Sequence, residues 1–345
     1  MRRIVAIALV GLGLVATACQ PGPSGGTIHM FTPDAKLVVR DLMVFSTAKG
    51  LDTPARSFLV RNAGSKNLVV SNITFSGSSA FRLVTGQARS FTLAPGAERT
   101  VSLIFRPGTV TGKHTASLFV HSSDAAQPRD EMFLLGFNAR DYENSMEPNR
   151  AQIVDAVGYR TNVGTGLPRD TVNAGEEIRS GYWRRANTGQ PVQLFPLARY
   201  SSRTSGATGN TYWYPQGSSA RNELYRFAGC NCQDPIAPNE DGGENQKLLP
   251  VPSSSNTGFA PAGAFGIALR ASGEIMHSDD ALNDAPGTNS NTHNFRFWPM
   301  RDMAGNVVPN AYIVGNDLGL NNLTNPTKNW DYQDFMYVLS NVRPA

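Results

Sequence analysis

Short apolar runs separated by turn residues recur along this chain of 345 residues and limit its fold more than any other feature. Runs rich in Val, Ile, Phe and Thr and bounded by Gly or Pro are typical of β-strands. No stretch keeps a helical period over three turns, so the sequence predicts an all-β protein. In the first half the runs number about seven, as in an immunoglobulin-like sandwich. They are Leu37–Val39, Ser57–Arg61, Leu68–Phe75, Phe81–Val84, Thr100–Phe105, Ala116–His121 and Met132–Leu135.

Turns with Gly or Pro at defining positions separate these runs, at Arg61–Gly64, Ala94–Ala97 and Arg106–Gly108. The turns and the apolar positions around them form one pattern, carried by Val60, Asn62, Gly64, Leu68, Val70, Ile73, Phe75, Gly77, Leu93–Gly96, Thr100, Val101, Leu103, Phe105, Pro107, Thr111, Gly112 and Ser122–Asp124. This pattern resembles the Hydin-type domains of bacterial surface proteins, also called choice-of-anchor modules. The resemblance implies an immunoglobulin-like sandwich over residues 36–139 that serves as a spacer or interaction module and not as a catalytic domain.

The first eighteen residues have the composition of a signal peptide, with two arginines followed by an apolar run from Ile4 to about Val15. That run is too short for a membrane span. The segment Ala16-Thr17-Ala18-Cys19 resembles the lipobox of bacterial lipoproteins, although that family prefers Leu where this chain has Ala16. The resemblance implies cleavage after residue 18, lipidation of Cys19 and a lipid-anchored place in the cell envelope. The resemblance also implies sorting to the outer membrane or cell surface, because Gln20 and not Asp follows the cysteine. The alternative is a simple secreted protein.

The mature chain is nearly neutral, because two of the 31 basic residues belong to the signal peptide and the chain has 27 acidic residues. Without a basic stripe, nucleic acid is not an expected partner. Residues 19–35, after the lipidated cysteine, are rich in Pro, Gly and Ser and predict a flexible spacer. The polar segment 140–150 predicts a linker to a second domain over residues 151–345.

The second domain differs in composition, since it contains all four tryptophans and both cysteines other than Cys19. Long polar loops separate its apolar runs, and binding sites are usually built on such loops. The sequence therefore predicts a second β-sandwich, jelly-roll-like, that carries the ligand site. Its strand candidates are Gln193–Tyr200, Ala264–Leu269, Asn294–Trp298, Tyr312–Val314 and Phe335–Leu339.

Oxygen ligands gather near the C-terminus, where Asn316 and Asp317 are followed by Asp331 and Asp334. Calcium takes six to eight oxygen ligands from carboxylates, amides and backbone carbonyls. Asp331 and Asp334 are three residues apart at the start of an apolar strand, so a loop or bulge is needed to turn both toward one ion. The sequence predicts a Ca²⁺ site here.

The segment from Asn329 to Asp334, with the earlier segment His277–Asn283, resembles the acidic C-terminal domains of bacterial cell-surface and exported proteins. The resemblance implies a β-sandwich with a calcium and a carbohydrate or adhesive role. Asn329 replaces Asp at the first acidic position of that motif, which lowers the ligand charge. Asp279 and Asp280 are expected to add a second carboxylate pair to the same site. The alternative is that these residues cap turns and make local Asx hydrogen bonds.

Aromatic residues among the polar loops are candidates for stacking on a sugar ring. Trp213, Tyr214 and Trp330 are the predicted ligand-binding rings, with burial in the sandwich core as the alternative. Cys230 and Cys232 form a Cys-x-Cys pair that predicts a local disulfide. A soft-metal site and free thiols are the alternatives for this pair.

No nucleophile elbow, phosphate-binding glycine loop or zinc-helix motif occurs in the sequence, so an enzyme is not expected. The features together favour a surface-anchored binding or adhesion lipoprotein that recognises an envelope or extracellular polysaccharide through calcium-ordered loops. One alternative is a structural envelope protein that packs in a surface layer or multiprotein complex. A glycan hydrolase with a carboxylate pair such as Glu274 and Asp279 is the less favoured alternative.

Overall fold

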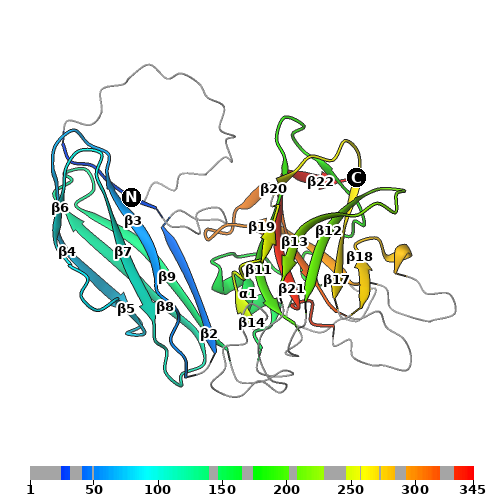
Figure 1. Cartoon of the computed structure of the whole chain (residues 1–345), viewed down its shortest axis with the longest axis horizontal. Helices are drawn as coiled ribbons and strands as arrows, with labels where there is room; N and C mark the ends of the chain where they lie inside the picture. The colour runs from blue at the N-terminus through cyan, green and yellow to red at the C-terminus, as the bar shows by residue number, and fades with distance from the viewer. Residues whose placement is uncertain are drawn as a thin grey trace.

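Four β-sheets form two tandem β-sandwiches in the computed structural model (Figure 1). The structure describes residues 25–31, 41–48, 50–139, 147–164, 174–201, 208–228, 246–256, 258–271, 273–283, 293–318 and 330–345. The predicted signal peptide, the lipidation site Cys19 and the pair Cys230 and Cys232 lie outside these residues. The predicted all-β fold is confirmed. None of the helices in the described ranges has the length and apolar character needed to cross a membrane.

The first sandwich contains sheets I and II. Sheet I has the order β1 (Ile28–Phe31), β3 (Arg56–Asn62), β7 (Glu98–Phe105) and β5 (Phe81–Leu83). Sheet II has the order β2 (Leu42–Ala48), β9 (Arg129–Ala139), β8 (Gly112–Ser122), β4 (Leu68–Gly77) and β6 (Phe91–Leu93), with β2 parallel to β9. Alternate side chains fill the core between them. In β7, for example, Val101, Leu103 and Phe105 are buried while Ser102 and Ile104 are half-buried.

Strand β1 lies inside the segment that the sequence predicts to be a flexible spacer. Its four residues pair with Leu59–Asn62, and the backbone N–H of Ile28 donates to Asp124 Oδ2 at 3.0 Å. Ile28 and Met30 are buried in the core. The spacer prediction for residues 19–35 is therefore wrong for this strand, because an apolar residue at every second position outweighs the surrounding glycines.

A short helix, α1 (Arg150–Ala156), leads into the second sandwich. The Asn149 side chain accepts from the Gln152 backbone N–H, and the Gln152 side chain accepts from the Asn149 N–H, so a capping box begins the helix. The helix thus starts inside the segment 140–150 that the sequence predicts to be a linker.

The second sandwich contains sheets III and IV. Sheet III has the order β14 (Gln246–Leu248), β11 (Val192–Tyr200), β21 (Phe335–Ser340), β20 (Val307–Asn316) and β19 (Phe295–Arg301), and β16 (Gly258–Phe259) pairs with β11. Sheet IV has the order β15 (Ser254–Ser255), β13 (Asn222–Phe227), β12 (Gly209–Pro215), β17 (Phe265–Ala271), β10 (Trp183–Arg185) and β22 (Val342–Pro344), and β18 (Glu274–His277) pairs with β17. Each of the five strands predicted in this half overlaps an observed strand.

A further apolar core joins the two sandwiches. The outer face of sheet II contributes Leu42, Val44, Leu135 and Phe137, which pack with α1 and with the outer face of sheet III. At its rim the Ser46 and Tyr200 hydroxyls lie 3.4 Å apart, and Lys113 of β8 pairs with Asp155 of α1. Sheet III is therefore covered on both faces, and every residue of β21 is buried. Residues 147–164 consequently belong to a packed interface between the domains.

Candidate functional site

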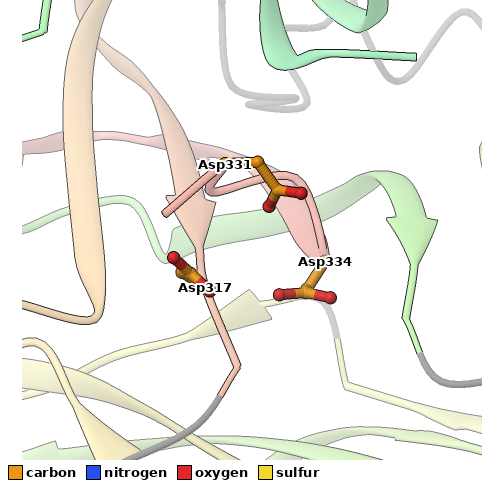
Figure 2. A group of neighbouring side chains, drawn as sticks. All are labelled: Asp317, Asp331 and Asp334. Atoms are coloured by element: carbon orange, nitrogen blue, oxygen red, sulfur yellow. The ribbon is translucent and has the colours of Figure 1, made fainter. Parts of the chain in front are cut away.

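Three carboxylates predicted to bind calcium meet where neighbouring strands of sheet III end. Asp317 follows β20 and Asp334 precedes β21, and the two strands pair with Asn316 opposite Phe335. Asp331 lies three residues before Asp334. One carboxylate oxygen from each of Asp317, Asp331 and Asp334 lies within 4.8 Å of the others (Figure 2). We call this group the Asp317 cluster.

An unusual backbone conformation turns Asp331 toward the other two carboxylates. Trp330 and Tyr332, on either side of it, have φ angles of 67° and 58°. Bulky residues rarely adopt this left-handed conformation, which costs about 1–2 kcal/mol per residue. The sequence spacing requires a loop or bulge to turn Asp331 and Asp334 toward one point. The left-handed conformations of Trp330 and Tyr332 provide it.

Backbone amides hold the cluster in place from several directions. Asp334 Oδ2 accepts from the Leu318 N–H at 2.7 Å, and Asp331 Oδ1 accepts from the Gln333 N–H at 3.3 Å. The Asp317 N–H donates to the carbonyl oxygen of Asn294 at 3.0 Å. Backbone amides thus hold the carboxylates of Asp331 and Asp334 and the backbone of Asp317 in the arrangement described here.

Burial and mutual repulsion disfavour the ionised form of this cluster. Burial raises the pKa of Asp334 well above its usual range, and the charges of Asp331 and Asp317 raise that pKa further. Asp317 is only 1% exposed. Carboxylates this close cannot all ionise at low cost without a neighbouring cation.

Two buried side-chain amides lie in the segments that carry the cluster. Asn316 is fully buried and Gln333 is 5% exposed, and neither side-chain oxygen has a hydrogen-bond donor among the described residues. The Asn316 amide nitrogen donates to the Asn294 carbonyl at 3.0 Å. Two oxygens bound to one Ca²⁺ at about 2.4 Å can be at most about 4.8 Å apart, so the spacing of the three carboxylates fits a single ion of this kind.

Asp279 and Asp280, which the sequence assigns to the same site, have other partners. Asp279 begins the short 3₁₀ helix Asp280–Leu282, accepts from the Ala281 N–H at 3.2 Å and accepts from the Tyr182 hydroxyl at 2.7 Å. Asp280 pairs with His293. Neither belongs to the Asp317 cluster. This part of the ligand prediction is wrong, because the two carboxylates serve as a helix cap and as an ion-pair partner.

A buried ionic network that the sequence does not predict lies beside the cluster. His293 Nε2 is 2.8 Å from Oε1 of Glu177, and Arg296 pairs with the other oxygen of that carboxylate. The Arg296 guanidinium lies 4.4 Å from the centre of the Tyr332 ring, whose hydroxyl donates to the His293 carbonyl at 2.7 Å. The network therefore supports the backbone on one side of Asp331. The motif His293-x-Phe-Arg296 is visible in the sequence, but nothing there indicates Glu177 as its partner.

The rings predicted to bind a sugar lie against other parts of the protein. Tyr214 is 1% exposed and Trp330 is 8% exposed. Trp213 packs on the core between sheets III and IV, stacked on Phe259 at 5.5 Å between ring centroids. The structure therefore favours the core alternative for Tyr214 and Trp330, since little of their ring surface is left for a ligand, whereas Trp213 is half-buried at the edge of that core.

A comparison with known protein families gives a match within the first sandwich. Residues 35–134 match the family described as HYDIN/CFA65/VesB-like, Ig-like domain. No curated protein matches the chain.

Solved structures are similar at low identity. A protein of unknown function from Porphyromonas gingivalis W83 is 14% identical with a TM-score of 0.26, over 35% of this chain and 50% of that one. The secreted serine protease VesC from Vibrio cholerae is 11% identical with a TM-score of 0.26, over 90% of this chain and 52% of that one. This chain thus spans about half the length of each. The family match supports an Ig-like domain in the first sandwich, and strands β2 to β9 of sheets I and II lie within or overlap the matched residues 35–134.

Proposed function

We propose that this chain is a lipid-anchored, non-catalytic binding protein of the cell envelope whose second sandwich holds Ca²⁺ at Asp317, Asp331 and Asp334 and recognises a polysaccharide. The observation that carries the proposal is the convergence of these three carboxylates within 4.8 Å at the ends of two paired strands. The Ig-like family match supports a structural or binding role for the first sandwich.

Ionising three neighbouring carboxylates at this site is costly without a cation. This cost favours a metal site over the alternative that these residues cap turns. A bound Ca²⁺ offsets the burial and the repulsion that raise the pKa of Asp334, and it offsets the strain at Trp330 and Tyr332. Calcium tolerates irregular ligand arrangements from loops better than Mg²⁺, which demands near-ideal octahedral geometry.

The incomplete ligand set suits recognition of a sugar. Three carboxylates provide fewer than the six to eight ligands that calcium prefers unless each binds through both oxygens. Asp331 and Asp334 are half-buried and not fully enclosed. Neighbouring hydroxyls of a polysaccharide can therefore complete the coordination in place of water.

Terbium luminescence tests the metal site directly, because Tb³⁺ replaces Ca²⁺ and Trp330 adjoins Asp331. The mature chain, residues 19–345, is titrated with Tb³⁺, and its emission is excited through the aromatic residues. We expect sensitised emission that Ca²⁺ displaces and that Asp331→Asn abolishes. The matched control Asp302→Asn removes a carboxylate that accepts from Ala304 and Asn306 in an exposed turn, and should leave the emission unchanged.

Thermal unfolding provides an independent measure, since a ligand bound only by the native state raises its stability. Calcium should raise the midpoint of wild-type protein and of Asp302→Asn, and not that of Asp331→Asn. Absence of both the emission and the stabilisation at millimolar calcium would reject the metal site.

Glycan arrays probed with the full mature chain test the ligand class. Binding to a polysaccharide in calcium that disappears in chelator supports the proposal. Calcium binding with no glycan retained would instead favour the structural alternative.

The structural alternative has one observation in its favour, the apolar core that joins the two sandwiches. A stiff two-domain body is suited to packing in a surface layer or complex. Cross-linking in intact cells distinguishes the two functions, because a structural protein should give one dominant protein adduct.

A further inference from the structure

We infer that cation binding at the Asp317 cluster controls how firmly the two sandwiches are packed together, with helix α1 as the connecting element. The inference rests on the proposed calcium site and adds a regulatory consequence to it. It is carried by contacts at both ends of α1.

The start of α1 is bonded to the segment that contains Asp331. Arg150 is 2% exposed, and its Nη1 donates to the backbone carbonyl of Asp331 at 3.2 Å. Its Nε donates to the Val163 carbonyl at 2.7 Å. Glu147, just before the helix, accepts from the Gln333 side chain at 3.2 Å. The position of residues 331–333 therefore fixes where the helix begins.

The apolar side of α1 belongs to the core between the sandwiches. Ile153, Val154 and Val157 lie in the same cluster as Leu42 and Leu135 of sheet II. A shift of the helix by a fraction of its diameter would open this core, because packed interiors do not deform continuously.

The end of α1 is bonded to the first sandwich and to the chain that follows. Asp155 pairs with Lys113 of β8, and its other oxygen lies 2.6 Å from Arg160. The helix thus contacts the Asp317 cluster at one end and the first sandwich at the other.

The coupling follows from the charge of the cluster. Without a cation, repulsion from Asp317 and Asp334 favours conformations in which Asp331 moves away, and Arg150 then loses its contact with the Asp331 carbonyl. A bound cation holds Asp331 in the position described here, so the packed arrangement binds the cation more tightly than a loosened one. A ligand shifts such an equilibrium only through this difference in affinity, which typically amounts to about 5- to 150-fold.

Hydrogen exchange measured by mass spectrometry on the mature chain tests the coupling. Calcium should slow exchange about fivefold or more in three places, namely residues 330–336, helix α1 and strand β2, which shares the core with α1. Slowing confined to residues 316–318 and 330–336 would overturn the inference while leaving the calcium site intact. If calcium neither binds nor displaces Tb³⁺, the proposed function itself fails.

The test becomes specific with a variant that removes one of the two contacts described above between residues 331–333 and the start of α1, but no carboxylate of the cluster. Glu147→Ala deletes the acceptor of the Gln333 side chain and also a charge that acts on Asp334, so its Tb³⁺ affinity is measured in parallel. The variant should still bind Tb³⁺ and should show a smaller calcium effect on α1 and β2. The control Glu98→Ala removes an exposed carboxylate of the first sandwich that pairs with Arg61, and should keep the full effect. Equal calcium effects in both variants would show that the contact between Glu147 and Gln333 has no part in the coupling.

Discussion

His293 Nε2 lies 2.8 Å from Oε1 of Glu177, and its Nδ1 lies 2.8 Å from Oδ2 of Asp280, so one imidazole is held between two carboxylates. Burial lowers the pKa of His293, but the hydrogen bonds and charges of the two acids more than offset it, and the pKa is raised above 6.5. The imidazolium therefore contributes stability that is fully present below about pH 6.5 and is lost as the pH rises through the folded-state pKa.

His293→Gln should accordingly cost more unfolding free energy at pH 5.5 than at pH 9, measured by urea denaturation. His29→Gln, on exposed positions of strand β1, serves as the control and should show no such difference. An equal cost of His293→Gln at both pH values would mean that the imidazole acts here as a neutral hydrogen-bonding group.

Asp130 is expected to destabilise the first sandwich at neutral pH. Burial, and then the charge of Asp41, raise the pKa of Asp130 to about 6. The folded state therefore holds the proton more tightly than the unfolded state, and stability falls as the pH rises from about 4 to 6. Asp130→Asn should raise the free energy of unfolding by roughly 1–2 kcal/mol at pH 8, allowing for solvent screening, and by little at pH 4. Glu98→Gln is the control, and a stabilisation independent of pH would contradict the explanation.

Gly266 provides the space in which the Tyr214 ring lies. A Cβ at Gly266 would be 2.3 Å from the Tyr214 ring, whereas a Cβ at Gly263 meets nothing within 4 Å. Gly266→Ala should destabilise the protein by about 1–3 kcal/mol in urea unfolding, and Gly263→Ala should not. Combining Gly266→Ala with Tyr214→Leu should recover part of the loss, since the two residues are in contact. Additive losses in the double variant would place the strain elsewhere.

The shared core predicts that damage to one sandwich reaches the other. Leu42 belongs to the core between the sandwiches, and Leu68 belongs to the internal core of the first sandwich. Leu42→Ala and Leu68→Ala should each cost about 2–5 kcal/mol. Hydrogen exchange should rise in strands β11 and β21 in Leu42→Ala, and chiefly within sheets I and II in Leu68→Ala. The same exchange pattern in both variants would argue against a separate contribution from the interface.

The strands were largely predictable from local patterns. The apolar run Phe335–Leu339 indicates a strand, and its lack of alternation is typical of a strand buried on both faces. What covers its second face is not encoded locally, because Leu42 and Leu135 are distant in the chain. The sequence did not predict strand β1, because its strand conformation depends on pairing with the distant residues Leu59–Asn62, whereas the neighbouring glycines indicate a flexible segment.

The three carboxylates of the candidate site could be predicted from the sequence, but the ionic network beside them could not. Asp317, Asp331 and Asp334 are close in sequence and chemically suited to one cation. Glu177 is 116 residues from His293, so no spacing signal connects the two. Asp280 has the same chemistry as the cluster residues, and only the fold shows that His293 is its partner.

The core between sheets II and III also limits how this architecture can be rearranged by recombination. Immunoglobulin-like domains are often exchanged between proteins as independent units, cut at their connecting segments. Here a cut between residues 139 and 147 would leave Leu135 and Phe137 on one fragment and Ile153 and Met336 on the other, each facing water. Proteins that carried only one of the two sandwiches would be prone to aggregate unless the exposed apolar residues were also replaced. The two sandwiches are therefore expected to be inherited as a pair.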